Sequence, residues 1–217
     1  SDITGAIVAR AVNADVYENW TDVSGFLMAD PRIVKDPKPI GRISYNELRE
    51  LAYMGASLLH EDSIAPPRIA GITINIRNTN EPDDAGTIIE EIFREEKRSV
   101  ITGIAGSKDF SVIAISKNGM SREVGFIRKL CSILEDYDVN IEHMPSGIDT
   151  FSVVVSSKAL SDKKEDIVEE IKRKLDVETI DVFDNLALIA TVGAGMAQRQ
   201  GTSAKLFEAL ANEKVNV

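Results

Sequence analysis

The segment WTDVSGFLMADPR at 20–32 carries the side chains of the first half of the chain that are best suited to bind a ligand. It follows a short run with the spacing of a strand, and open α/β sheets bind ligands beyond the carboxyl ends of their strands. Thr21 and Asp22 provide a hydroxyl and a carboxylate there, and Arg32 provides a cation. An Asx turn at Asp22 followed by a proline turn accounts for the same residues without a ligand. Both interpretations stay open at the level of the sequence.

A second candidate site lies in the second half, where a loop at 120–126 leads into the start of a helix and a strand reading VNIE follows at 139–142. The free backbone N–H groups of a helix start suit a carboxylate. The Asn140 side chain and the Glu142 carboxylate suit an ammonium group, so the two parts together fit a free amino acid. The alternative is that Gly125 only permits close helix packing and that Glu142 is a solvated strand residue.

The composition excludes several other classes of site. Among the 217 residues, 35 acidic side chains outnumber 25 basic ones, and the net charge of -10 argues against a nucleic-acid partner. No apolar run approaches the roughly 18 residues of a membrane span, and no signal peptide is recognisable, so the sequence predicts a cytoplasmic protein with no membrane partner. Cys131 has no cysteine to pair with, and His60 and His143 lack further ligands at a suitable spacing. No metal site is predicted.

The first half has the pattern of an α/β domain. A helix is expected at 3–13, a strand at 15–20 and a second strand at 72–78. Ser44 and Glu47 form a Ser-x-x-Glu capping box that predicts the start of a second helix. Pro66-Pro67 is expected to end any helix. A highly charged run places the domain boundary near Glu95, so that two domains are expected, at 1–95 and 96–217.

The second half contains an internal repeat. A shift of 76 residues lays 112–141 over 188–217 without a gap, and ten of the thirty positions are identical. The first copy is expected to form strands at 111–116, 139–144, 151–156 and 178–183, with helices at about 122–135 and at 162–175. This order is the ferredoxin-like βαββαβ arrangement. The second copy has only its first strand, helix and second strand, so it is expected to be incomplete.

Three segments of the chain resemble the aspartokinases, enzymes that phosphorylate the side-chain carboxylate of aspartate. The start of the chain, SDITGAIVARAVNADVYENWTDVSGFLMADPRIV, is similar to the family segment after its glycine-rich turn. ISYNELRELAYMGASLLH and IAGITINIRNTNEPDDAGTII resemble the rest of the nucleotide-binding half, and the repeat resembles paired ACT regulatory domains.

The resemblance implies a fold and a domain arrangement. The fold is α/β, with the C-terminal half of an amino acid kinase fold followed by ferredoxin-like ACT domains, of which the second is truncated. The first ACT domain is expected at about 107–184, and the second at about 99–106 together with 185–217. A strand at 100–104 is expected to pair with the second copy.

The resemblance also implies a reaction. It is the transfer of phosphate from ATP to L-aspartate, which gives ADP and 4-phospho-L-aspartate at the first step of lysine, threonine and methionine biosynthesis. Ser1 and Asp2 are the implied aspartate-binding residues, with Asp2 catalytic, although Asp2 before a helix is also an ordinary N-cap. Mg²⁺ is expected with ATP. The implied ATP contacts are Thr21, Asp22, Leu27, Met28, Ala29, Asp30, Pro31, Arg32 and Ser57.

Ser57 is a weak member of that set. Many aspartokinases have lysine at the corresponding position, where its charge meets the ATP phosphates, and a serine hydroxyl supplies no charge. Phosphate neutralisation would then depend more on magnesium, on Arg32 or on parts of the family fold outside the chain.

The resemblance implies feedback regulation by lysine and/or threonine and a homo-oligomer formed through the ACT domains. The implied effector contacts are Met120, Arg122, Glu123, Val124, Gly125, Asn140, Ile141 and Glu142. The corresponding residues of the second copy are expected to serve structure or an interface. The 217-residue chain is expected to be inactive alone, because the lobe with the phosphate loop is absent. The alternative is a non-catalytic amino-acid-sensing module or subunit.

Overall fold

The computed structural model describes residues 2–55, 59–91 and 100–217, and it divides the chain into two compact units. The first unit comprises Ser1–Gly106 and Ile189–Val217, and the second comprises Ser107–Leu188. The expected boundary near Glu95 lies outside the described residues. No described helix is long and apolar enough to span a bilayer.

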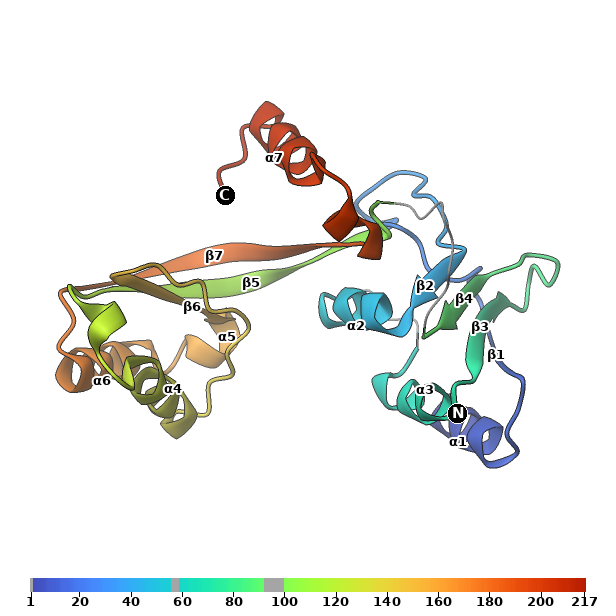
Figure 1. Cartoon of the computed structure of the whole chain (residues 1–217), viewed down its shortest axis with the longest axis horizontal. Helices are drawn as coiled ribbons and strands as arrows, with labels where there is room; N and C mark the ends of the chain where they lie inside the picture. Colours follow the sequence, from blue (N-terminus) through green and yellow to red (C-terminus); the bar gives the residue numbers. More distant parts are fainter. Residues whose placement is uncertain (1, 56–58, 92–99) are drawn as a thin grey trace. The chain divides into compact units, whose positions relative to one another are not determined.

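The first unit contains a four-stranded sheet with the strand order β1-β3-β4-β2 (Figure 1). The pairs β1/β3 and β2/β4 are parallel, and β3/β4 is antiparallel. Isoleucines from three of the strands, together with α2, form the core of this unit. Its elements up to residue 90 are α1 (Asp2–Ala11), β1 (Val16–Thr21), β2 (Arg42–Ser44), α2 (Tyr45–Tyr53), the 3-10 turn η1 (Glu61–Ser63), α3 (Ala65–Ala70), β3 (Thr73–Asn78) and β4 (Thr87–Glu90).

The capping box at the start of α2 is confirmed. The Ser44 hydroxyl accepts from the Glu47 backbone N–H, and the Glu47 carboxylate accepts from the Ser44 backbone N–H. The prediction that Pro66-Pro67 ends any helix is wrong, because both prolines lie in the first turn of α3. A proline is tolerated there, since the first N–H groups of a helix have no acceptor within the helix.

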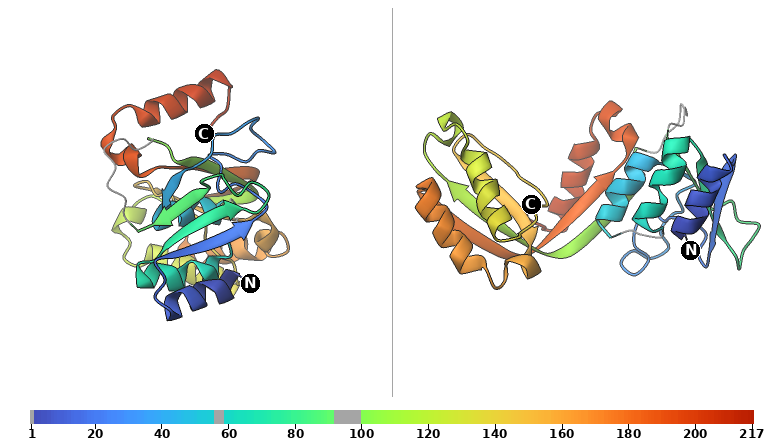
Figure 2. Two further views of the ribbon diagram at one scale, coloured as in Figure 1. Left: turned by 90° about the vertical axis from the view of Figure 1, so that its right-hand side faces the viewer. Right: turned by 90° about the horizontal axis from the view of Figure 1, so that it is seen from below.

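The second unit is built around a three-stranded sheet with the order β6-β5-β7. Figure 2 shows α4 and α6 beside this sheet, and their apolar side chains form one core with those of β5 and β6. The elements are β5 (Gly103–Ser116), η2 (Met120–Arg122), α4 (Phe126–Asp136), β6 (Thr150–Ser156), α5 (Ser157–Leu160), α6 (Lys164–Leu175) and β7 (Thr179–Val192).

Several predicted boundaries in the repeat change. The separate strands expected at 100–104 and 111–116 are largely one strand, β5, and the strand expected at 178–183 extends to Val192. The first helix begins at Phe126 rather than near 122, because Gly125 has a left-handed backbone with φ 82°. The strand expected at 139–144 forms only an isolated bridge between His143 and Val154.

The second copy of the repeat continues in the first unit as η3 (Ala194–Gln198) and α7 (Thr202–Asn212). Gly201 before α7 has φ 81°, which matches the equivalent Gly125. Thr102 donates its backbone N–H to the Val192 carbonyl at 2.7 Å, so the 100–104 segment meets the second copy as predicted. No residue of α7 is buried, whereas the equivalent helix α4 buries four.

Candidate functional site

Asp2, the implied catalytic residue, lies in the first turn of α1. Its backbone carbonyl accepts a hydrogen bond from the Tyr17 hydroxyl at 3.1 Å, which ties the helix start to β1. Gly5 leaves room for this contact, because a Cβ there would lie 2.8 Å from the same hydroxyl oxygen. Ser1, the other implied aspartate contact, lies outside the described residues.

The segment after β1 folds back on itself as an irregular hairpin. Met28 donates its N–H to the Lys38 carbonyl, and Ile40 donates to the Phe26 carbonyl, both at 2.8 Å. The buried Thr87 hydroxyl anchors the base of the hairpin, because it accepts from the Phe26 N–H at 2.8 Å and donates to the Ile40 carbonyl at 2.6 Å. Gly25 is required beside it, since it has φ 84° and a Cβ would lie 2.3 Å from that hydroxyl oxygen.

Thr21 ends β1 and pairs in register with Asn78, which ends β3. The ends of two parallel strands therefore meet at the position where α/β sheets bind ligands. The Thr21 hydroxyl donates to the Asp22 carboxylate at 3.2 Å, and Asp22 is exposed. The Thr21 carbonyl accepts from both the N–H and the hydroxyl of Thr79, each at 2.8 Å. The strand end is thus fixed while its side chains reach the surface.

Sequence reasoning missed a polar network at the same edge. The Asn78 amide donates to the Ser24 hydroxyl at 3.0 Å, and that hydroxyl donates to the Asp84 carboxylate at 2.6 Å. The hydrogen bond from Ser24 holds the pKa of Asp84 below its usual value. The one sequence signal for this network was the position of Asn78 at the end of a predicted strand. The contact between Ser24 and Asp84 had no such signal, because Asp84 lies 60 residues from Ser24 and in a turn.

Arg32, the expected cation, is already paired. Its guanidinium contacts the Asp30 carboxylate at 2.7 Å, with a second contact at 3.0 Å, although the Arg32 side chain is 85% exposed. The side-chain hydrogen bond from Arg32 lowers the pKa of Asp30, so Asp30 remains charged. A phosphate that binds Arg32 would therefore compete with Asp30. Ser57 lies outside the described residues.

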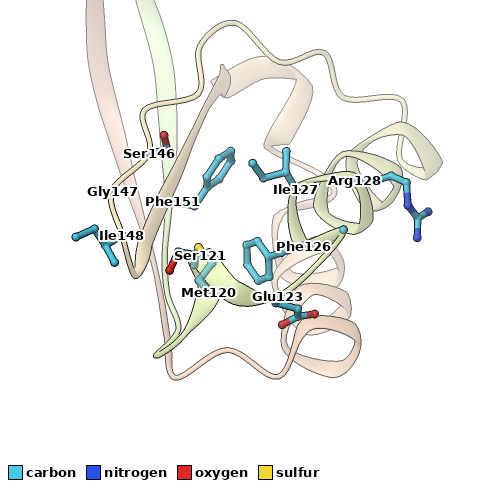
Figure 3. Close-up of a pocket in the computed structure, with 11 residues that line it drawn as sticks. Met120, Ser121, Glu123, Phe126, Ile127, Arg128, Ser146, Gly147, Ile148 and Phe151 are labelled. Carbon is cyan, nitrogen blue, oxygen red and sulfur yellow. The ribbon is translucent and has the colours of Figure 1, made fainter.

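A cavity of about 280 Å³ lies in the second unit beside the start of α4. Figure 3 shows Phe126, Ile127 and Phe151 directed toward a common space and Arg128 directed away from it. Met120, Glu123 and Gly125 of the predicted effector set are among the lining residues, and Arg122, Val124, Asn140, Ile141 and Glu142 are not. The other lining residues are Ser121, Phe126, Ile127, Arg128, Ser146, Gly147, Ile148 and Phe151.

The start of α4 offers this cavity backbone donors. Gly125 supplies no side-chain cap. The Phe126 N–H donates to the Glu123 carbonyl at 3.4 Å, so the first-turn donors left for a ligand are the N–H groups of Ile127 and Arg128. Glu123 is held at the rim by Lys117 and Lys129, each at 2.8 Å, and hydrogen bonds from these lysines lower the pKa of its carboxylate. The cavity therefore combines an apolar wall with a paired charge cluster and a helix start that favours an anion.

The segment 139–142 does not reach the cavity lining. The Glu142 N–H donates to the Val154 carbonyl at 2.9 Å, and the Asn140 amide donates to the Glu142 carboxylate at 3.3 Å. The turn at 146–148 takes part in the lining instead, and sequence reasoning missed it. Its signal was weak, since a Ser-Gly pair between two strands is typical of an ordinary turn.

The described residues contain no cluster of three or more histidine, cysteine or acidic side chains that could hold a metal ion. The described side chains could therefore bind magnesium only together with a nucleotide. In that arrangement, which nucleotide enzymes commonly use, the substrate phosphates supply most of the metal ligands and the protein supplies one or two carboxylates. Asp22, exposed at the end of β1, is the predicted ATP contact best placed to be such a ligand.

Comparison with known proteins gives two family matches. The model of the amino acid kinase family matches residues 1–78, and an ACT domain model matches residues 189–217. Aspartokinase 3 of Bacillus subtilis is 38% identical over 218 residues, which cover 100% of this chain and 48% of the relative.

Solved structures give the same result. The aspartate kinase of Clostridium acetobutylicum is 56% identical with a TM-score of 0.94, covering 100% of this chain and 50% of that one. Escherichia coli aspartokinase III in complex with aspartate and ADP is 23% identical with a TM-score of 0.75 over 96% of this chain and 47% of that one, which shows a shared fold. The chain thus spans about half the length of the relatives it matches. From end to end, its sequence belongs to the aspartokinase family.

Proposed function

We propose that the protein represented by this chain is an aspartate kinase, which transfers phosphate from ATP to the side-chain carboxylate of L-aspartate. The whole-chain similarity to the Clostridium enzyme, at 56% identity and a TM-score of 0.94, is the observation that carries this proposal. The product is 4-phospho-L-aspartate. The reaction would be the first step of lysine, threonine and methionine biosynthesis, and it would take place in the cytoplasm.

Nucleotide binding is assigned to the edge where β1 and β3 end. Thr21 and Asp22 lie there, and the hairpin that carries Leu27–Arg32 is anchored beside them through Thr87. Phosphoryl transfer depends on positioning and on neutralising phosphate oxygens, so a rigidly anchored loop suits this role. Ser57 is retained as a weaker contact, and Ser1 with Asp2 is assigned to aspartate. Bound magnesium would supply charge neutralisation, with Asp22 as the proposed protein ligand.

The cavity in the second unit is assigned to a free amino acid that regulates the enzyme. The first-turn N–H groups of α4 suit its carboxylate, and Phe126 and Phe151 offer the side chain an apolar wall. A solved Escherichia coli aspartokinase III contains lysine and aspartate, and that precedent favours lysine here, with threonine as the alternative. The predicted effector contacts remain part of this proposal, and three of them line the cavity, namely Met120, Glu123 and Gly125. The others are Arg122, Val124, Asn140, Ile141 and Glu142.

The domain assignment is also proposed. The kinase segment is assigned to 1–95 and the regulatory region to 96–217, with ACT domains at 107–184 and at 99–106 with 185–217. The compact second unit, Ser107–Leu188, supports the first ACT domain, and the match of an ACT model to 189–217 supports the second. ACT domains of this type are proposed to join copies of the protein into a homo-oligomer.

The test of the regulatory site is calorimetry of the 217-residue chain with lysine and threonine. Glu123→Ala should weaken binding about tenfold or more, because the one acidic side chain among the lining residues would no longer accept a charge-assisted hydrogen bond from the ammonium group. Glu165→Ala, which replaces an exposed glutamate on α6, is the matched control and should leave binding unchanged. Equal binding by the wild type and by Glu123→Ala would remove Glu123 from the site.

The second candidate function is a non-catalytic amino-acid sensor, and the pairing of Arg32 with Asp30 favours it, because the cation expected to meet phosphate already contacts a carboxylate. Calorimetry with ADP separates the two candidates. Binding of ADP supports the kinase, whereas binding of lysine or threonine without ADP supports the sensor.

The chain alone is expected to lack kinase activity, since it spans about half the length of the relatives it matches. Aspartate-dependent release of ADP by the isolated polypeptide, measured in a coupled assay, would contradict this expectation.

A further inference from the structure

One buried carboxylate in the first unit accepts more hydrogen bonds than its helix needs. Glu47 is 6% exposed. Its Oε2 accepts from the Ser44 N–H at 3.0 Å and the Ser44 hydroxyl at 2.7 Å, which completes the cap of α2. Its Oε1 accepts from the Thr102 hydroxyl at 2.7 Å and from the Ala194 N–H at 2.8 Å. These two donors are 55 and 147 residues away in sequence, so Oε1 serves a tertiary contact.

The segment that Thr102 belongs to also holds the candidate nucleotide hairpin. Thr102 donates its N–H to the Val192 carbonyl, and Ile104 donates its N–H to the Met28 carbonyl, both at 2.7 Å. A Cβ on Gly103 would lie 2.9 Å from Leu51 of α2 and 3.4 Å from the Met28 carbonyl oxygen. The 102–104 segment is therefore enclosed between α2, the end of β7 and the hairpin.

The turn that Ala194 belongs to is equally confined. A Cβ on Gly193 would lie 2.2 Å from the Val100 carbonyl oxygen and 2.9 Å from the Ile101 Cα. This turn belongs to the part of the chain that matches an ACT domain model, at 189–217. Glu47 thus joins three parts of one compact unit, namely α2, the 102–104 segment and the ACT turn.

The chemistry of this contact requires a carboxylate. Burial raises the pKa of Glu47, but hydrogen bonds from Ser44, Ala194 and Thr102 outweigh burial and hold the pKa below its usual value. Each oxygen accepts two donors. Glutamine has one acceptor oxygen, and its NH₂ group would face donors on the other side, so Glu47→Gln must break one pair of contacts.

We propose that Glu47 is a positioning residue that fastens the ACT turn and the 102–104 segment to α2 and thereby fixes the Met28 backbone of the candidate nucleotide hairpin. Through these hydrogen bonds the ACT region influences the position of the hairpin within the first unit. The effect on nucleotide binding rests on the proposed function. The fastening by Glu47 does not depend on the proposed function, and it is tested separately.

Hydrogen exchange of backbone amides in the 217-residue chain tests the fastening. Glu47→Gln and the near-isosteric Thr102→Val should each speed exchange at the Ile104 amide about fivefold, as expected for the loss of one typical buried hydrogen bond. Ser44→Ala, the matched control, removes a hydroxyl donor from the other oxygen of the same carboxylate and should change Ile104 exchange less than about twofold. Unchanged exchange at Ile74 and Ile76, in the core of the first unit, verifies that each variant is folded there.

Faster exchange confined to the first turn of α2 in Glu47→Gln, with Ile104 as slow as in the wild type, would overturn the proposal and leave Glu47 as a helix cap only. Thr102→Val keeps the test decisive if Glu47→Gln fails to fold, because it leaves the capping box intact. In a second arm, ADP affinity measured by calorimetry should fall about fivefold in Thr102→Val and stay within about twofold of the wild type in Ser44→Ala. If wild-type chain binds no ADP, the nucleotide proposal fails and the exchange result still decides the role of Glu47.

Discussion

At the scale of single residues, the hairpin beside β1 depends on one buried hydroxyl. Thr87 is fully buried and joins the Phe26 N–H to the Ile40 carbonyl. Thr87→Val keeps the shape but leaves both backbone groups without this partner, so we expect a loss of about 1–3 kcal/mol in the free energy of unfolding. Urea unfolding measures it, and Thr79→Val, which removes an exposed hydroxyl donor to Thr21, is the control and should cost less.

The rim of the cavity should respond to pH through Glu123. Hydrogen bonds from Lys117 and Lys129 place its folded pKa below the ordinary 4.5. Its contribution to stability is therefore present above about pH 4.5 and is lost as pH falls through the lower folded pKa. An NMR titration of the side-chain carboxyl should give a midpoint below 4.5 in the wild type, and Lys117→Met should move the midpoint upward. The same midpoint in both proteins would show that the lysine has no influence.

Residues whose role depends on local spacing were predictable, and those whose role depends on distant partners were not. Ser44 and Glu47 lie three positions apart, so the capping box could be predicted from sequence. The partners of the other Glu47 oxygen lie 55 and 147 positions away. The cavity combines the predicted loop at 120–125 with a turn at 146–148, and only the folded chain brings these together.

At the scale of elements, the two copies of the repeat differ in how their first helices are packed. Leu130 in α4 is 0% exposed, whereas the equivalent Leu206 in α7 is only half-buried. Leu130→Ala should therefore cost about 2–5 kcal/mol in the free energy of unfolding. Leu206→Ala should cost clearly less, and denaturant unfolding of the two variants compares them directly. Equal losses would mean that α7 is buried as deeply as α4.

The type of a secondary-structure element was predicted correctly where its apolar residues recur at a regular spacing. The apolar spacing in α4 and α6 predicted both helices. β4 was missed because it has only four residues and follows a turn-rich, acidic stretch. The continuity of β5 was missed because Gly103, Gly106 and Asp109 interrupt its strand pattern, and Asp109 adopts a positive φ of 68°. The strand expected at 139–144 has the right composition, but its pairing with β6 is limited to one bridge.

At the scale of the whole molecule, β5 and β7 are the elements shared by the two compact units. Both strands have fourteen residues and run across a boundary between units. An internal repeat in the sequence predicted a second ACT copy, and the matching left-handed glycines before α4 and α7 agree with it. The insertion of one ACT copy in the other came from the family resemblance. That Ile189–Val217 share a unit with Ser1–Gly106 was not predicted, because no local pattern encodes which distant segments share a unit.

The central claim is that the second unit binds a free amino acid at the start of α4. A two-dimensional ¹H–¹⁵N NMR titration of the 217-residue chain with lysine, and separately with threonine, tests it most directly. We expect saturable shifts that are largest at the amides of Ile127, Arg128 and Gly147, which lie at the first turn of α4 and in the facing turn. Saturable shifts confined to the first unit, or no saturable shift with either amino acid, would contradict the claim.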